Sequence, residues 1–405
     1  MKRSGVRGGG VRPRAVKLGV VKPSVVKSGA AKSSAVNPST VKPRIVKLGA
    51  VKPGAAKPGA VKPGSVKSGA AKSTAKPRAV KPGAAKPGAA KPVAAKPIIA
   101  VVGGFLGAGK TTLILTAARL LQQRGLRVAA ILNDQGDDLV DTHYAGASGI
   151  ACDQVTGGCF CCRFPDLVEA AGRLLEYRPD VIFAEAVGSC TDIVATTLRP
   201  LIRDHRDRFG IAPLTVVMHP QRAFDNPYLD FLYQNQLAEA DLIFERGDSA
   251  QAWIDRLLSG SVPAGAKTLD IDYARYAEAE AALAWLNARV TAHAAPPISS
   301  AMLVGPLLDR LEPQIRIVHL KLFTQSDAGY LKAALTANGQ DPMVEGALDA
   351  SPSATHEILL NVRALADPES LRAIVEREFA ALPALLTWQN VQCFRPSAPT
   401  PYFRM

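Results

Sequence analysis

Hydrophobic residues form short runs separated by stretches of helical spacing from residue 98 onward, whereas the preceding residues show no such pattern. A segment of helical spacing over residues 110–124 follows the first run. Five runs have the length and composition of buried strands, at residues 98–102, 127–133, 179–188, 214–218 and 240–245. Alternating strands and helices predict an α/β domain with a parallel sheet flanked by helices, in which ligands bind at the carboxyl ends of the strands.

The last quarter of the chain predicts a small α+β domain. Two strands are expected at residues 314–323 and 357–362. A short helix rich in Leu, Ala and Lys is expected at 329–335, and a longer helix at 368–382. Before this domain, helices are expected at residues 250–258 and 277–290, and a proline-containing interdomain linker at 294–299.

The first predicted strand leads into a glycine-rich turn, Gly104 to Thr111, that matches G-x-x-x-x-G-K-[ST]. Glycines let successive backbone N–H groups turn toward a phosphate, and the following helix N-terminus adds partial positive charge. In such a loop Lys110 reaches the β- and γ-phosphates and the Thr111 hydroxyl holds Mg²⁺. Because the loop lies between a strand and a helix, it predicts a nucleoside triphosphate site rather than an ordinary glycine-rich turn.

The net positive charge of the chain comes entirely from its first 97 residues. The formal net charge is +14, but residues 1–97 hold 23 of the 49 Lys and Arg residues and none of the 35 Asp and Glu residues. Residues 98–405 therefore hold 26 basic and 35 acidic side chains, a balance of −9. The tail has recurring proline, Lys-Pro-Gly-Ala repeats and no aromatic residue, so it can form neither a core nor a continuous helix. We expect it to be disordered.

Three roles for this tail stay open. The first role is that of a solvated spacer, or of an over-extended translation start. The second is a polyanion-binding segment similar to the Lys-Ala-Pro tails of linker histones. The third is a targeting segment. The third role is disfavoured because the tail lacks the apolar segment of a secretory signal and its prolines break a transit-peptide helix. No apolar run elsewhere is long enough to span a membrane, and a cytoplasmic protein without membrane contact is expected.

Three of the six cysteines, Cys159, Cys161 and Cys162, fall within four residues. Thiolates at this density select Zn²⁺, Cu⁺ or another soft metal ion, and three ligands leave one tetrahedral position open for exchange. An incidental thiol cluster and a redox switch are the alternatives. Further ligands are sought among the other cysteines and the histidines of this region, namely Cys152, Cys190, His143, His205 and His219. Cys393 is expected to be an isolated thiol, and nothing indicates a disulfide framework.

Carboxylates follow two of the predicted strands. The loop after residue 133 contains Asp134, Asp137 and Asp141, and the strand at 179–188 ends in Glu185-x-x-Gly188. A carboxylate at such a strand end is suited to the Mg²⁺ shell or to orienting an attacking water.

The order of these motifs resembles the CobW-type (CobW/HypB/UreG-like) P-loop GTPases, relatives of the nickel-insertion GTPases that serve urease and hydrogenase. The resemblance covers residues 98–379 through GGFLGAGKTT, N-[ED]-x-G, GCxCC and E-x-x-G. It implies a nucleoside triphosphate hydrolase that converts GTP to GDP and phosphate. This hydrolysis would gate the transfer of zinc, cobalt or nickel from the CxCC site to a client metalloprotein. The implied cofactors are GTP, Mg²⁺ and Zn²⁺ or another soft divalent metal.

Residue roles follow from the resemblance by position. Nucleotide binding is implied for Gly104, Gly107, Ala108, Gly109, Lys110, Thr111, Thr112, Gly188, Arg246 and Asp248. Catalysis is implied for Lys110, Glu185 and Asp134, and Mg²⁺ binding for Thr111 and Asp141. The zinc-type ligands are Cys159, Cys161 and Cys162. The implied domains are the tail at 1–97, the GTPase domain at 98–293 and a CobW C-terminal-like domain at 301–390.

The sequence departs from the family pattern in the element that reads guanine. The family's N-K-x-D appears as Glu245-Arg-Gly-Asp248, in which Asp248 can still accept hydrogen bonds from guanine while Glu245 replaces the usual Asn. The switch also reads Asp134-Gln135 where Glu-Phe is typical. GTP is therefore preferred over ATP less strongly than in the family, and the client is expected to differ.

Two other classes of function remain open beside the metal-dependent GTPase. One is a P-loop ATPase or phosphotransferase with an incidental thiol cluster. The other is a nucleic-acid-associated NTPase led by its basic tail, which would also make non-specific polyanion contacts. A homodimer is possible in each case.

Overall fold

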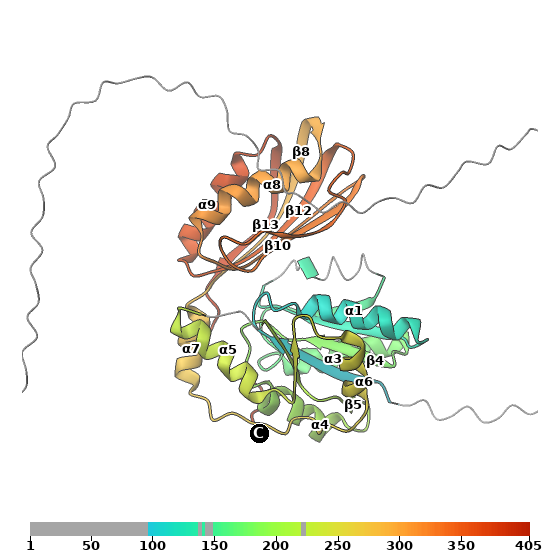
Figure 1. Cartoon of the computed structure of the whole chain (residues 1–405). Helices are drawn as coiled ribbons and strands as arrows, with labels where there is room; N and C mark the ends of the chain where they lie inside the picture. Colours follow the sequence, from blue (N-terminus) through green and yellow to red (C-terminus); the bar gives the residue numbers. More distant parts are fainter. Residues whose placement is uncertain (1–95, 137–139, 142–148, 220–223) are drawn as a thin grey trace, which may run out of the picture. The chain divides into compact units, whose positions relative to one another are not determined.

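Seven parallel strands form the first of two sheets in the computed structural model, which describes residues 96–405 except 137–139, 142–148 and 220–223 (Figure 1). The order is β3-β2-β4-β1-β6-β7, and β5 pairs with β1 beside this path. The strands are β1 (Ile98–Gly104), β2 (Val128–Asn133), β3 (Ala151–Val155), β4 (Val181–Glu185), β5 (Gly210–Ile211), β6 (Thr215–Met218) and β7 (Leu242–Glu245). The parallel sheet predicted from the sequence is confirmed.

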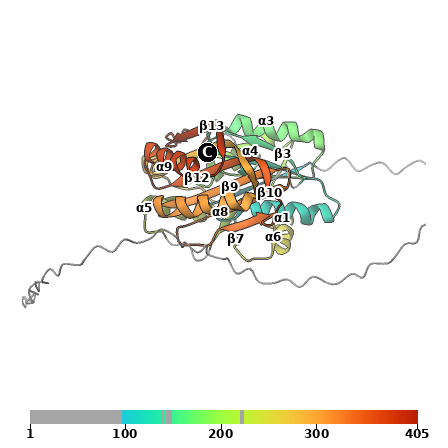
Figure 2. The same ribbon diagram turned by 90° about the horizontal axis from the view of Figure 1, so that it is seen from above.

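Helices cover both faces of this sheet because its strands alternate buried residues between two cores. Ile99 and Val101 contact the core under α3, α4, α5 and α7, whereas Ala100 and Val102 contact the core under α1 and α6. Figure 2 shows α1 and α6 on one side and α3 on the other. The helices are α1 (Lys110–Gln123), α3 (Phe164–Leu174), α4 (Arg199–His205), α5 (Pro227–Glu239), α6 (Ala250–Leu258) and α7 (Tyr273–Ala281), with single turns η1 (Leu175–Tyr177) and η2 (Val194–Leu198).

The second sheet is antiparallel and has the order β11-β10-β9-β12-β8-β13. Its core is formed with α8 (Ser300–Leu311) and α9 (Pro368–Ala380), which both pack on it (Figure 1). The strands are β8 (Ala284–Ile298), β9 (Ile317–Ser326), β10 (Gly329–Leu335), β11 (Met343–Gly346), β12 (Ser353–Ala364) and β13 (Leu385–Phe394), and η3 (Glu312–Gln314) follows α8. The predicted small α+β domain is confirmed.

Three local predictions in this region are wrong. The helix expected over 277–290 ends at Ala281, and residues 284–298 form β8, so the linker expected at 294–299 is the end of a strand. Alternation explains this, because Trp285 contacts the core of the first sheet and Leu286 the core of the second. The helix expected over 329–335 is β10, in which pairing with β9 overrides the helix preference of Leu, Ala and Lys.

Among the described residues, no helix has both the length and the apolar character that crossing a membrane requires. Except for Lys96 and Pro97, the predicted tail lies outside the described residues, as do Asp137 and His143.

Candidate functional site

The predicted phosphate loop connects β1 to α1 and is held against the neighbouring strand. A side chain at Gly104 would place its Cβ 2.5 Å from the Val217 carbonyl oxygen, and the φ of Gly104 is 131°. Only glycine fits both conditions, so the loop can leave β1 at this sharp angle. Helix α1 then starts at Lys110, directly after Gly109 in a left-handed conformation.

Lys110 is buried at the start of α1. Its Nζ donates to the carbonyl oxygens of Gly104 at 2.8 Å and Phe105 at 3.4 Å. Burial lowers the pKa of Lys110 to about 8, against the opposing effect of Glu185. Its ammonium group is therefore sensitive to pH near neutrality, unlike that of a solvated lysine.

Binding of a triphosphate is expected to weaken as the pH rises above about 8. A bound triphosphate favours the protonated ammonium group, so the contribution of Lys110 is complete below its pKa and is lost above it, by about tenfold per pH unit. Titration of a fluorescent GTP analogue at a series of pH values measures this slope. Lys110→Arg, whose guanidinium group stays protonated, is the control and should flatten the profile; a flat wild-type profile would contradict the assignment.

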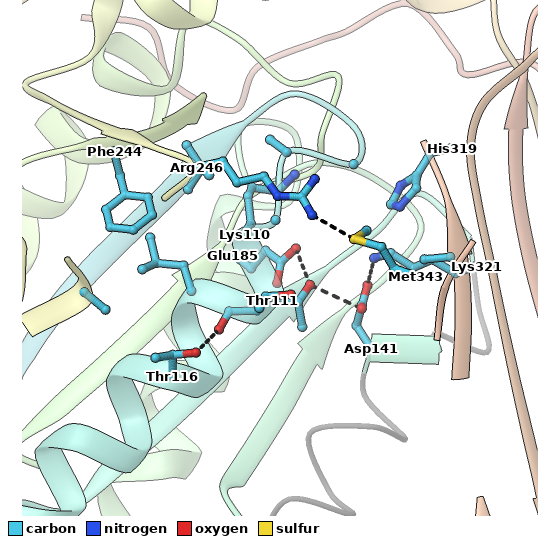
Figure 3. Close-up of a pocket in the computed structure, with 18 of the residues that line it drawn as sticks. Lys110, Thr111, Thr116, Asp141, Glu185, Phe244, Arg246, His319, Lys321 and Met343 are labelled. Carbon is cyan, nitrogen blue, oxygen red and sulfur yellow. Dashed lines mark hydrogen bonds and ion pairs between the residues drawn. The ribbon is translucent and has the colours of Figure 1, made fainter. Parts of the chain in front are cut away.

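Three oxygen-bearing side chains meet below the loop. The Thr111 hydroxyl lies 3.0 Å from Glu185 Oε1 and 3.2 Å from Asp141 Oδ1 (Figure 3). Glu185 is buried at the end of β4, and its Oε2 has no hydrogen-bond partner among the described residues. Burial, and then the charge of Asp141, raise the pKa of Glu185. Hard oxygen donors around one threonine hydroxyl, with one carboxylate oxygen unpaired, fit Mg²⁺.

These groups open into a pocket of about 320 Å³. Ten of the residues implied by the resemblance line it: Gly107, Ala108, Gly109, Lys110, Thr111, Thr112, Asp141, Glu185, Arg246 and Asp248. Gly104, Gly188 and Asp134 are not among its lining residues, and neither are the clustered cysteines. Strand ends and the phosphate loop thus bring most of the expected nucleotide-binding residues to one place.

The second sheet also lines this pocket, which sequence reasoning missed. Its lining includes His319 and Lys321 of β9, Lys332 of β10 and Met343 of β11. Lys321 forms an ion pair with Asp141 (Figure 3). Burial raises the pKa of Asp141, but Lys321 and Lys332 outweigh it and lower that pKa overall. Two cations from a separate sheet therefore face the acidic, oxygen-rich side of the pocket.

Arg246 and Asp248 lie at the end of β7, on the exposed rim of the pocket. Arg246 donates to the Met343 sulfur at 3.0 Å, and Asp248 Oδ2 accepts from the Glu245 N–H at 2.9 Å. Glu245 itself is not among the lining residues. The departure from the family pattern at Glu245 therefore affects a residue outside the pocket lining. Asp248, the aspartate suited to guanine, lies on the rim.

Asp134 is held by the second sheet instead of facing Thr111. Both of its carboxylate oxygens accept from Arg363 Nη2 at 2.8 Å, and the Arg363 side chain is only 4% exposed. The Arg363 guanidinium group also lies 4.0 Å from the Trp285 ring centroid. With Lys110 and Glu185, Asp134 lines a separate cavity of about 40 Å³. It is thus placed to connect the loop after β2 to the second sheet.

The Cys159, Cys161 and Cys162 side chains form a compact cluster. Their sulfur atoms all lie within 4.8 Å of one another, and Cys159 and Cys161 are each 3.6 Å from Cys162. Asn133, at the end of β2, fixes this loop: its Nδ2 donates to the Val155 and Gly158 carbonyls, and its Oδ1 accepts from the Phe160 N–H. Hydrogen bonding to the other cysteines and burial raise the pKa of Cys161.

Of the additional ligands considered from the sequence, Cys190 lies beside the cluster, 4.0 Å from Cys161. Cys152 packs with the core on the α1 side of the sheet, whereas Cys159, Cys161 and Cys190 belong to the core on the α3 side. Among the described residues, His205, His219 and Cys190 all lie outside the group of side chains close enough to share one metal ion as they stand. Cys393 is on β13 and donates to the Pro368 carbonyl, away from this cluster.

The comparison with known families gives a match within the first domain. Residues 98–251 match the model of the CobW/HypB/UreG nucleotide-binding domain. The chain is 28% identical to the zinc chaperone CobW of Pseudomonas aeruginosa over 42% of this chain and 56% of that protein. It is 35% identical to the zinc chaperone YjiA of Escherichia coli over 23% of this chain and 30% of that protein. The chain therefore spans about half or less of these relatives.

Among solved structures, the zinc-bound YjiA GTPase of Escherichia coli aligns with 71% of this chain and 99% of its own, at 15% identity and a TM-score of 0.28.

Proposed function

We propose that the protein is a GTPase of the CobW/HypB/UreG type, the family whose nucleotide-binding domain model matches residues 98–251, and that its hydrolysis is coupled to a metal ion held by the cysteine cluster. The observation that carries this proposal is that the segment at the end of β4 reaches both sites, while the segment at the end of β2 joins the cysteine loop to the second sheet, which also lines the nucleotide pocket. The end of β2 gives Asn133 to the cysteine loop and Asp134 to the contact with Arg363. The end of β4 gives Glu185 to Thr111, and Cys190 follows five residues later.

In this proposal Lys110 neutralises the β- and γ-phosphates as charge develops on them during hydrolysis. Thr111, Asp141 and Glu185 would hold Mg²⁺, which would supply positive charge to stabilise the phosphates. We assign the orientation of the attacking water to Glu185 Oε2, because this oxygen is buried and has no partner among the described residues. We assign Asp134 a positioning role, because both its oxygens are engaged by Arg363.

The base preference in this proposal is for guanine. Asp248 lies on the pocket rim after β7, where a carboxylate accepts from the N1–H and the exocyclic amino group of guanine. Adenine offers no matching pair of donors on that edge, so Asp248 would discriminate against ATP.

The metal ion in this proposal is the substrate of a transfer to a client metalloprotein. Soft thiolates at Cys159, Cys161 and Cys162 suit zinc, and the family's other cargoes, cobalt and nickel, are alternatives. A metal bound there would bias the ends of β2 and β4, and through them the geometry at Thr111 and Glu185. If the bound metal changes the affinity for the nucleotide by some factor, linkage requires that the bound nucleotide changes the affinity for the metal by the same factor.

The decisive experiment measures metal content and turnover together. We expect untagged protein to bind stoichiometric zinc, to prefer GTP over ATP in competition, and to release phosphate faster with the metal bound. Cys161→Ser should lower metal loading and remove the metal stimulation, because it deletes a buried thiolate ligand of the cluster.

Cys393→Ser is the matched control, since Cys393 is a free thiol outside the cluster. Full metal loading and metal-stimulated turnover in Cys161→Ser would contradict the proposal. A preference for ATP without bound metal would favour an ATPase or phosphotransferase instead.

A further inference from the structure

We propose that Cys190 is a fourth thiolate ligand, which closes the metal site formed by Cys159, Cys161 and Cys162. This inference rests on the proposed function, because it assigns the complete ligand set of the same metal ion. The sequence leaves the fourth position open and names Cys190 only as one of several candidates for it, beside Cys152 and three histidines.

The sulfur–sulfur distances support one shared ion. Zinc lies about 2.3 Å from each thiolate, and two thiolates on one tetrahedral ion are therefore about 3.8 Å apart. The two distances to Cys162 are 3.6 Å, and Cys190 lies 4.0 Å from Cys161. These three values are within a few tenths of an ångström of the tetrahedral separation. Cys190 lies outside the group whose sulfur atoms are all within 4.8 Å of one another, so its side chain has to rotate toward the cluster to bind the same ion.

Cys190 is held in place independently of the cluster. Gln236 of α5 donates through its Nε2 to the carbonyl oxygens of Gly188 at 3.0 Å and Cys190 at 2.9 Å. The Cys190 side chain is 1% exposed and belongs to the same core as Cys159 and Cys161. The backbone at Cys190 is therefore held by the fold, and only the side chain has to rotate to reach a shared ion.

The C-terminal residues tie the two cysteine-bearing segments together. The Tyr402 N–H donates to the Cys161 carbonyl at 2.8 Å, and the Thr400 N–H donates to the Cys162 sulfur at 3.3 Å. Two residues beyond Cys190, the buried Asp192 accepts from Arg404 at 2.8 Å. One short segment thus contacts the loop of Cys161 and Cys162 and also the loop of Cys190, and it limits how far they can separate.

A four-thiolate site has a consequence for release. Closed tetrahedral sites hold zinc firmly, whereas a site with an open position exchanges it. Release then requires Cys190 to withdraw, and Cys190 is in the segment that begins at Glu185 and contacts the phosphate loop. A side chain at Gly188 would place its Cβ 2.7 Å from a methyl carbon of Leu106 in that loop. Movement of this segment with the nucleotide is therefore a direct route to opening the metal site.

X-ray absorption spectroscopy of the wild-type protein loaded with Zn²⁺ alone tests the ligand set without any substitution. Four sulfur neighbours are expected for the wild type, and three sulfurs plus one oxygen for Cys190→Ala. The affinity of Cys190→Ala for Zn²⁺, from chelator competition, should fall by at least the roughly 10- to 100-fold that loss of a supporting group costs. Co²⁺ loading gives an independent count, because the thiolate-to-cobalt absorption band should weaken in the variant.

Cys152→Ala is the matched control, because Cys152 is a free thiol of the same domain on the other face of the sheet. It should keep four sulfur neighbours and unchanged affinity. Three sulfurs in the wild type, with equal affinity in Cys190→Ala, would overturn this assignment and leave the proposed function intact. A wild type that binds neither Zn²⁺ nor Co²⁺ would overturn both.

Discussion

Replacing Lys110 with methionine is expected to lower GTP turnover by roughly 10²–10³-fold, the range seen when one preorganised donor to a developing charge is removed. Lys110 lines the pocket and is the cation that the phosphate loop itself supplies. Lys321, also in the lining, is already paired with Asp141. Steady-state phosphate release at saturating GTP measures the loss.

The fold should survive this change. Methionine has a similar length and keeps the buried position filled, and it removes a charge whose burial is unfavourable, as the lowered pKa of Lys110 indicates. Lys267→Met is the matched control: Lys267 also donates to a backbone carbonyl, that of Ala240, but it is not among the pocket residues. Turnover of Lys110→Met equal to that of the control would remove Lys110 from the catalytic site.

The predictable parts of this protein are those encoded by contiguous residues. The phosphate loop is one such part, because strand, turn and helix follow each other within residues 98–123. Its lysine and threonine are side by side at the helix start and need no tertiary contact to reach one site. The first sheet was predictable for a related reason, since strands buried on both faces form continuous apolar runs.

Residues that meet only through distant pairing were not predictable. Lys321 and Lys332 are in strands whose pattern does not distinguish a pocket lysine from a solvated one, and only the pairing of β9 and β10 places them together. The same pairing turns residues 329–335 into a strand against their helix preference. Cys190 is 29 residues from Cys161, and nothing in the sequence distinguishes it from Cys152 as a candidate for a further metal ligand.

The contact between Asp134 and Arg363 gives the second large expected effect: Arg363→Met should lower the free energy of unfolding by about 3 kcal/mol. Arg363 donates two hydrogen bonds to Asp134 and further ones to the Leu286 carbonyl and the Asn287 side chain. Breaking a buried ion pair from one side leaves the partner charge uncompensated, which costs about 3–5 kcal/mol. We expect the lower end, because the Asp134 side chain is 20% exposed and water can solvate it in part.

Urea unfolding followed by tryptophan fluorescence measures the change, since Trp285 lies directly beneath the Arg363 guanidinium group. Arg289→Met is the control in the same sheet: Arg289 pairs with Glu357 at side-chain exposures of 31% and 50%, so its loss should cost less than about 1 kcal/mol. A second substitution, Asp134→Asn, should recover part of the loss in Arg363→Met, because it removes the unpaired carboxylate charge. If Arg363→Met is no less stable than Arg289→Met, the ion pair does not join the loop after β2 to the second sheet in solution. The proposed connection from the cysteine loop through Asn133 and Asp134 to Arg363 would then be contradicted.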